Sequence, residues 1–90
     1  MCIVALAWQV LTDTPLCLLS NRDEFYRRPT AALAAWPQSP IVAGQDLESG
    51  GTWMGVTQSG RWAVITNYRD ANDVREYPTS RGHIIQAFLE

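Results

Sequence analysis

The chain begins with two apolar runs that are separated by a short polar stretch. Residues 2–10 (CIVALAWQV) and 16–20 (LCLLS) are rich in apolar and β-branched residues, and residues 12–15 (TDTP) have turn chemistry. This pattern predicts a β-hairpin. Apolar side chains occupy both odd and even positions of the first run, so both faces of the hairpin should be covered by other layers. The pattern therefore predicts a layered sandwich.

The position of the turn decides which residues meet at the open end of this hairpin. With residues 12–14 at the tip, Cys2 faces Glu24. Arg22 lies two positions earlier in its strand and shares that face, whereas Asp23 points to the opposite one; a register slip of one residue would reverse these faces. The sequence thus predicts that the start of the chain and a charged segment are neighbours.

The middle of the chain predicts further strands. Residues 25–39 contain two prolines around an Ala-rich stretch, which favours a long connection with room for one helical turn. A short strand is expected at residues 41–43. A second hairpin is expected from residues 52–58 and 61–67, joined by a Ser-Gly turn.

The last apolar positions indicate a helix. Thr79 or Ser80 can cap its start. Four apolar residues then follow helical spacing: Ile84, Ile85, Phe88 and Leu89. This stripe has little left in the chain to pack against, and no Gly, Asn or Pro ends the helix before Glu90. We therefore expect residues 1–90 to be the N-terminal part of a single larger domain.

Composition narrows the partners that the chain can bind. Hydrophobic residues make up 47% and charged residues 18% of the chain, and the formal net charge is −2. This balance gives no basic surface for nucleic acid. The opening apolar run is far shorter than the roughly 20 residues of a membrane-spanning helix. A signal peptide has Lys or Arg before its apolar run, and neither precedes this one. We expect a cytoplasmic protein without a membrane span.

Cys2 is the main candidate for chemistry. It follows Met1 directly, and its small side chain permits removal of the methionine, which would leave a thiol and a free α-amine on one residue. The reference α-amino pKa of about 7.7 to 8.0 lies below the reference thiol pKa of about 8.5, so such an amine can accept the proton without a histidine. The single histidine, His83, belongs to the predicted final helix. A nearby guanidinium from Arg22 would favour the thiolate, and a carboxylate could orient the amine.

Each of these features also has a structural interpretation. A cysteine at the start of an apolar strand can be a packing residue, and Cys17, near the far end of the hairpin, is expected to be one. Residues 21–24 could form a turn in which Arg22 and Glu24 make an exposed pair worth at most about 1 kcal/mol. Two cysteines at this spacing predict neither a disulfide framework nor a metal site.

Four sequence blocks carry a resemblance to a known family. They are Met1-Cys2, Asn21-Arg22-Asp23-Glu24, Gly50-Gly51-Thr52-Trp53-Met54-Gly55 and Thr66-Asn67-Tyr68-Arg69. In this order and at this spacing they resemble the NRDE family, also called the transport-and-Golgi-organization 2 family. That family is similar to N-terminal-nucleophile hydrolases of the choloylglycine hydrolase, penicillin V acylase and acid ceramidase kind. These enzymes have a mainly antiparallel αββα four-layer sandwich, an α+β fold, and cleave non-peptide amide bonds.

The resemblance implies roles for particular residues. Cys2 matches the nucleophile and Arg22 matches an arginine that follows the second strand. Asn67 resembles the asparagine that helps to form the oxyanion hole, a contribution of roughly 3 to 4 kcal/mol in known cases. The hydrolases also have an aspartate three positions beyond the arginine, where this chain has no acid. Asp23 or Glu24 must substitute for it, or its role is absent.

Two functions from different classes follow. The first is a cysteine amidohydrolase that cleaves a small-molecule amide and needs no metal or organic cofactor. The second is a non-catalytic carrier or trafficking protein that uses the same cleft for a lipid-like ligand, because the resembled family is associated with Golgi organisation and with haem or lipid handling. The sequence leaves both open.

Overall fold

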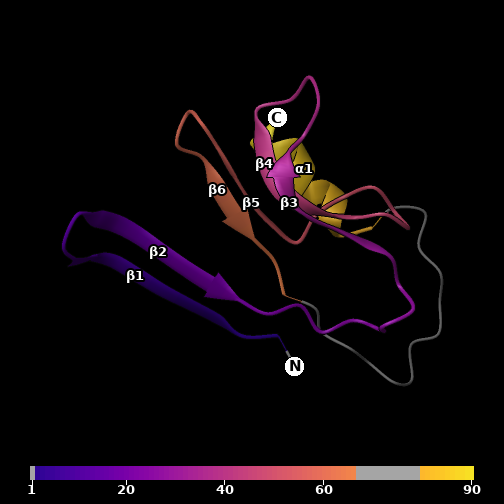
Figure 1. The fold of residues 1–90 in the computed structure, drawn as a ribbon, viewed down its shortest axis with the longest axis horizontal. Coiled ribbons are helices and arrows are strands. Elements are labelled where there is room, and N and C mark those ends of the chain that lie inside the picture. Colours follow the sequence, from indigo (N-terminus) through magenta and orange to yellow (C-terminus); the bar gives the residue numbers. More distant parts are fainter. Residues whose placement is uncertain (1, 67–79) are drawn as a thin grey trace.

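A computed structural model describes residues 2–66 and 80–90, which form antiparallel strands and one helix (Figure 1). The elements in chain order are β1 (Val4–Leu11), β2 (Thr14–Ser20), β3 (Thr30–Ala35), β4 (Ile41–Asp46), β5 (Met54–Thr57), β6 (Trp62–Val64) and α1 (Gly82–Leu89). β1 and β2 form one sheet, and β3 to β6 form a second sheet in sequence order. The α+β class with antiparallel strands is confirmed for the described residues.

The first hairpin is confirmed, but its register differs from the predicted one. Val4 pairs with Ser20 and Leu11 pairs with Thr14, so the tip is two residues long rather than three. A register shift between Trp8 and Leu11 displaces the first strand by one more residue. Together these changes move the pairing by two positions and preserve the faces. Extending the ladder therefore places Cys2 level with Arg22 rather than with Glu24.

β3 is the element that the sequence pattern missed. Thr30–Ala35 was expected to be part of a connection, but it pairs with β4, where Thr30 lies opposite Asp46 and Ala35 opposite Val42. Four of the six residues of β3 are alanines, which have a weak preference for strands. Its conformation therefore depends on the backbone partners that β4 offers.

The second hairpin has a three-residue turn. Gly60 adopts a positive φ of 98° and its N–H donates to the Thr57 carbonyl at 3.1 Å. The Thr57 N–H in turn donates to the Arg61 carbonyl at 2.9 Å. Glycine provides this left-handed conformation without steric cost, as is usual in three-residue hairpin loops. As a result, Val56 pairs with Trp62.

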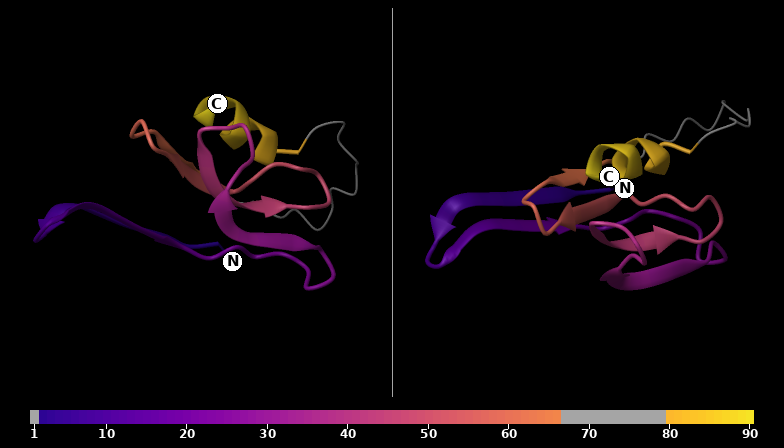
Figure 2. Two further views of the ribbon diagram at one scale, coloured as in Figure 1. Left: turned by 45° about the horizontal axis from the view of Figure 1, so that its top comes forward. Right: turned by 90° about the horizontal axis from the view of Figure 1, so that it is seen from above.

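Helix α1 covers one face of the four-stranded sheet, and Figure 2 shows the β1–β2 hairpin projecting away from both. The core contains Ile41 and Ala43 of β4 together with Ile85 and Leu89 of α1. The N-cap of α1 is Arg81, which makes no side-chain capping bond, rather than the predicted Thr79 or Ser80. The Ser80 hydroxyl, one residue earlier, accepts a hydrogen bond from the Gly82 N–H at 3.2 Å. The other two residues of the predicted apolar stripe, Ile84 and Phe88, are exposed.

The β1–β2 hairpin keeps large apolar side chains exposed on both strands. Val10 is 74% and Leu19 66% exposed. Cys17, which was expected to be buried, is half-buried because nothing within the described residues covers the hairpin completely. No helix among the described residues is long and apolar enough to cross a membrane.

Candidate functional site

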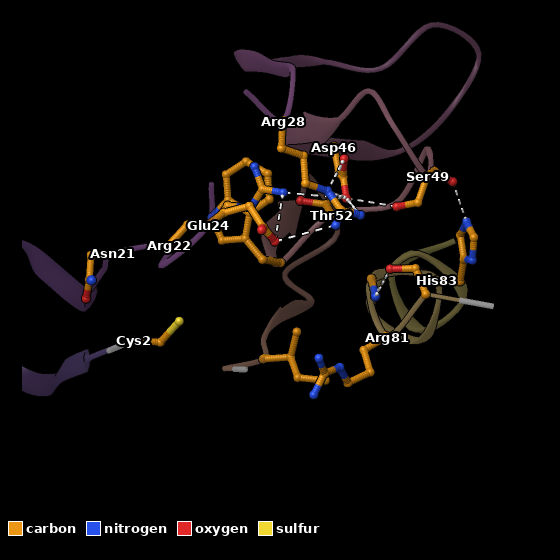
Figure 3. Close-up of a pocket in the computed structure, with 14 residues that line it drawn as sticks. Cys2, Asn21, Arg22, Glu24, Arg28, Asp46, Ser49, Thr52, Arg81 and His83 are labelled. Carbon is orange, nitrogen blue, oxygen red and sulfur yellow. Dashed lines mark hydrogen bonds and ion pairs between the residues drawn. The ribbon is translucent and has the colours of Figure 1, made fainter. Parts of the chain in front are cut away.

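A pocket of about 680 Å³ lies at one end of the four-stranded sheet (Figure 3). The antiparallel pairing brings the start of β3, the ends of β4 and β6 and the start of β5 to this end. The first residues of α1 form another wall. The segment that follows β2 brings the open end of the first hairpin to the same place, so the pocket combines residues from distant parts of the chain.

Cys2 lines this pocket. Its side chain is half-buried, and the backbone N–H of Asp23 donates a hydrogen bond to Sγ at 3.4 Å. A donor directed at sulfur stabilises negative charge on it. Figure 3 shows the thiol at some remove from the cluster of charged side chains on the opposite side of the pocket.

Arg22 lines the same pocket, but its guanidinium is directed at acidic groups. Its Nη2 lies 3.8 Å from Glu24 Oε2 and 3.5 Å from Asp46 Oδ2. It also stacks over the Trp53 ring at 4.6 Å and donates to the hydroxyl of Thr30. The positive charge of Arg22 is therefore shared with carboxylates in the pocket wall.

Asp46 and Arg28 form the most tightly bonded pair in this wall. Arg28 donates from Nε and Nη2 to the carboxylate at 2.7 to 3.1 Å, and the Ser49 hydroxyl donates at 2.8 Å. Burial alone raises the pKa of Asp46. The hydrogen bonds from Arg28, Ser49 and the Glu48 N–H outweigh that effect and hold it at about 2. The buried aspartate is therefore ionised near neutral pH.

The start of α1 is attached to the loop between β4 and β5. His83 Nε2 lies 2.8 Å from the Ser49 carbonyl oxygen, and the Thr52 N–H donates to the Gly82 carbonyl at 3.4 Å. A Cβ on Gly51 would lie only 2.6 Å from the Gly82 carbonyl carbon, so this contact requires a glycine. His83 is thus on the final helix, as predicted.

The five residues predicted for catalysis differ in how they are placed relative to the pocket. Cys2, Arg22 and Glu24 all line the pocket. Asp23 meets the thiol through its backbone N–H. Asn67 lies outside the described residues. Their catalytic roles stay predictions.

Sequence reasoning missed much of the pocket wall. Arg28, Asp46 and Arg81 line it and were not singled out. Asp46 carried one usable signal, because it is the only charged residue of β4 and stands at the end of that strand. Arg28 becomes its partner only through the pairing of β3 with β4, which the local pattern did not reveal.

The described residues form an α+β structure in which Cys2, near the start of the chain, lines a pocket together with arginines and carboxylates. A family model described as Transport and Golgi organisation 2 matches residues 1–90. The chain belongs to this family.

Among curated proteins, the chain is 40% identical to the Mus musculus Transport and Golgi organization 2 homolog over 81 residues. It is 37% identical to the Bos taurus homolog over 78 residues. Each match covers 82% of this chain and 28% of the relative. An uncharacterized Saccharomyces cerevisiae protein is 34% identical over 97 residues, covering 99% of this chain and 31% of that protein. The chain therefore spans less than a third of the length of these relatives. No solved structure matches it significantly.

Proposed function

We propose that this chain is the N-terminal part of an amidohydrolase that uses Cys2 as its nucleophile. The observation that carries the proposal is the position of Cys2, which opens onto a pocket while its sulfur accepts a backbone N–H. The resemblance to N-terminal-nucleophile hydrolases supports the same role. We place the domain in their αββα sandwich, because α1 covers only one sheet face and the hairpin is apolar on both of its faces.

The reaction follows from this arrangement once Met1 has been removed. The α-amine of Cys2 accepts the thiol proton, and Sγ attacks the carbonyl carbon of an amide. The tetrahedral intermediate collapses, the proton passes to the leaving nitrogen, and an amine and a thioester result. Water then cleaves the thioester to give a carboxylic acid and the free thiol. In this proposal Asn67 holds the oxyanion.

The charges in the pocket favour a ligand that carries an anionic group. Arg22 and Arg28 are both paired with Glu24 and Asp46. Arg81, the residue just before α1, also lines the pocket. In this proposal its guanidinium binds a carboxylate on the substrate. An N-acyl amino acid combines an amide with such a carboxylate.

Hydrolysis of N-decanoylglycine and of uncharged N-ethyldecanamide, measured by the release of free amine, tests this function. Replacement of Cys2 by Ala should abolish release, whereas Cys17→Ala should leave it unchanged. Arg81→Ala should raise KM for N-decanoylglycine about tenfold, the loss expected for one charge-assisted hydrogen bond, and leave KM for the neutral amide unchanged.

The opposite result would favour the carrier hypothesis. The relatives are named for transport and Golgi organization, and a carrier would bind its ligand in the same pocket without using the thiol. A Cys2→Ala variant that retains the function of the protein in cells would exclude the hydrolase.

A further inference from the structure

Asn21 makes two hydrogen bonds to the residue that follows Cys2. Its backbone N–H donates to the Ile3 carbonyl at 3.2 Å, and its side-chain Oδ1 accepts from the Ile3 N–H at 2.7 Å. In a regular antiparallel ladder, a hydrogen-bonded pair exchanges two bonds between main-chain groups. Here the side-chain oxygen of Asn21 accepts the bond that the main-chain carbonyl of Asn21 would accept in a regular ladder.

This substitution changes the course of the chain. Because the carbonyl of Asn21 does not pair with Ile3, the backbone can leave the direction of β2 immediately after Asn21. Two residues later, the Asp23 N–H meets the sulfur of Cys2 at 3.4 Å. The side chain of Arg22 meanwhile lies over Trp53. The ladder therefore ends one residue away from the thiol, with the last bond made by a side chain.

We infer that Asn21 is a positioning residue that fixes Cys2 against the pocket through the backbone of Ile3. This inference rests on the proposed nucleophilic role of Cys2 and assigns no chemistry to Asn21 itself. The requirement is specific, because the acceptor must reach a main-chain N–H across the strand pair. Aspartate keeps an oxygen at that position, alanine removes it, and glutamine moves it outward by one methylene.

Three measurements on the full chain test the role of Asn21. The first is the rate of hydrogen exchange at the Ile3 amide, and the second is the ratio of alkylation rates of Cys2 and Cys17 by iodoacetamide. The third is kcat against KM for N-decanoylglycine. Asn21→Gln should speed hydrogen exchange at the Ile3 amide and lower the ratio of Cys2 to Cys17 alkylation rates. Each change should be about five- to tenfold, the factor expected for one lost hydrogen bond. It should lower kcat with little change in KM.

Asn21→Asp keeps the acceptor oxygen and should restore slow exchange of the Ile3 amide, and this rescue separates positioning from a general loss of structure. Ser20→Ala serves as the matched control, since its hydroxyl reaches the Asn21 carbonyl at 3.4 Å and not Ile3. The inference would be overturned if Asn21→Gln kept the exchange rate and the alkylation ratio of the wild type. It would also be overturned if Asn21→Asp gave no rescue. These two readouts do not depend on turnover, so they decide the role of Asn21 even if Cys2→Ala shows that the protein is not a hydrolase.

Discussion

Asp46 is a buried carboxylate that connects three segments of the pocket wall. Its side chain is 9% exposed and accepts hydrogen bonds from Arg28, from Ser49 and from the N–H of Glu48. An isolated buried charge would be strongly destabilising, so these bonds are what make its position tolerable. The pocket wall therefore depends on Asp46 remaining ionised.

Replacement of Asp46 by Asn should destabilise the protein at neutral pH. The pKa of Asp46 falls from its usual 3.8 to about 2, which corresponds to about 2 kcal/mol of stability. Because the folded pKa is depressed, this contribution is present above pH 3.8 and is lost as the pH falls towards 2. Urea unfolding of wild type and Asp46→Asn between pH 7 and pH 2.5 measures it.

The two proteins should differ most at neutral pH and converge in acid. Glu48→Gln is the matched control, because Glu48 also pairs with Arg28, at 3.0 Å, but is 61% exposed. It should cause a much smaller change. Equal effects of the two substitutions would show that burial of Asp46 does not matter.

The elements show which parts of the fold local pattern can predict. The hairpins and the final helix follow from apolar periodicity and turn residues, and all of them are present. The register of the first hairpin was wrong by two positions because a two-residue tip and an irregularity near Gln9 leave no clear signal in the sequence. β3 was missed because its alanines become a strand only beside β4.

The same limit applies to the site. Cys2, Arg22 and Glu24 were placed near one another because a single hairpin connects them. Arg28 and Asp46 are 18 positions apart, and only the pairing of Thr30 with Asp46 brings them together. Contacts that cross between elements therefore required the structure.

The contact between the β4–β5 loop and α1 provides a test at this scale. A Cβ at position 51 would lie 2.6 Å from backbone of Gly82, so Gly51→Ala must push the helix away from the sheet. Overpacking of this kind costs about 1 to 3 kcal/mol. Thermal unfolding should show the loss.

An alanine in open space is the control for this substitution. Gln58 lies in the exposed turn of the second hairpin, so Gln58→Ala should change the melting temperature little. If Gly51→Ala had the same melting temperature as the wild type, the loop and the helix would not be in close contact.

The whole molecule exposes more surface than its size predicts. Its accessible surface is 6866 Å², against about 5,300 Å² expected for a compact protein of 10.1 kDa. The projecting hairpin contributes exposed apolar side chains to this surface, and Val10 and Leu19 are among the most exposed of them. Apolar patches of this kind commonly bind another protein surface.

Residues 1–90 studied alone should therefore self-associate as concentration rises. Sedimentation velocity should show a monomer that gives way to larger species, and the double variant Val10→Lys/Leu19→Lys should remain monomeric at higher concentration. Leu33→Lys, which changes a side chain that is 71% exposed but lies on β3, should have little effect. A wild-type chain that stays monomeric throughout would show that the hairpin needs no cover.

The most direct test of the central claim compares the two cysteines of this chain. Cys2 and Cys17 are both half-buried, so a difference in their reaction with limiting iodoacetamide reports chemistry rather than access. Peptide mapping by mass spectrometry should find Cys2 alkylated well before Cys17 in protein that has lost Met1. The advantage should disappear in protein that retains Met1, because the α-amine is then missing. Equal labelling of Cys2 and Cys17 in the processed protein would contradict the assignment of Cys2 as a nucleophile.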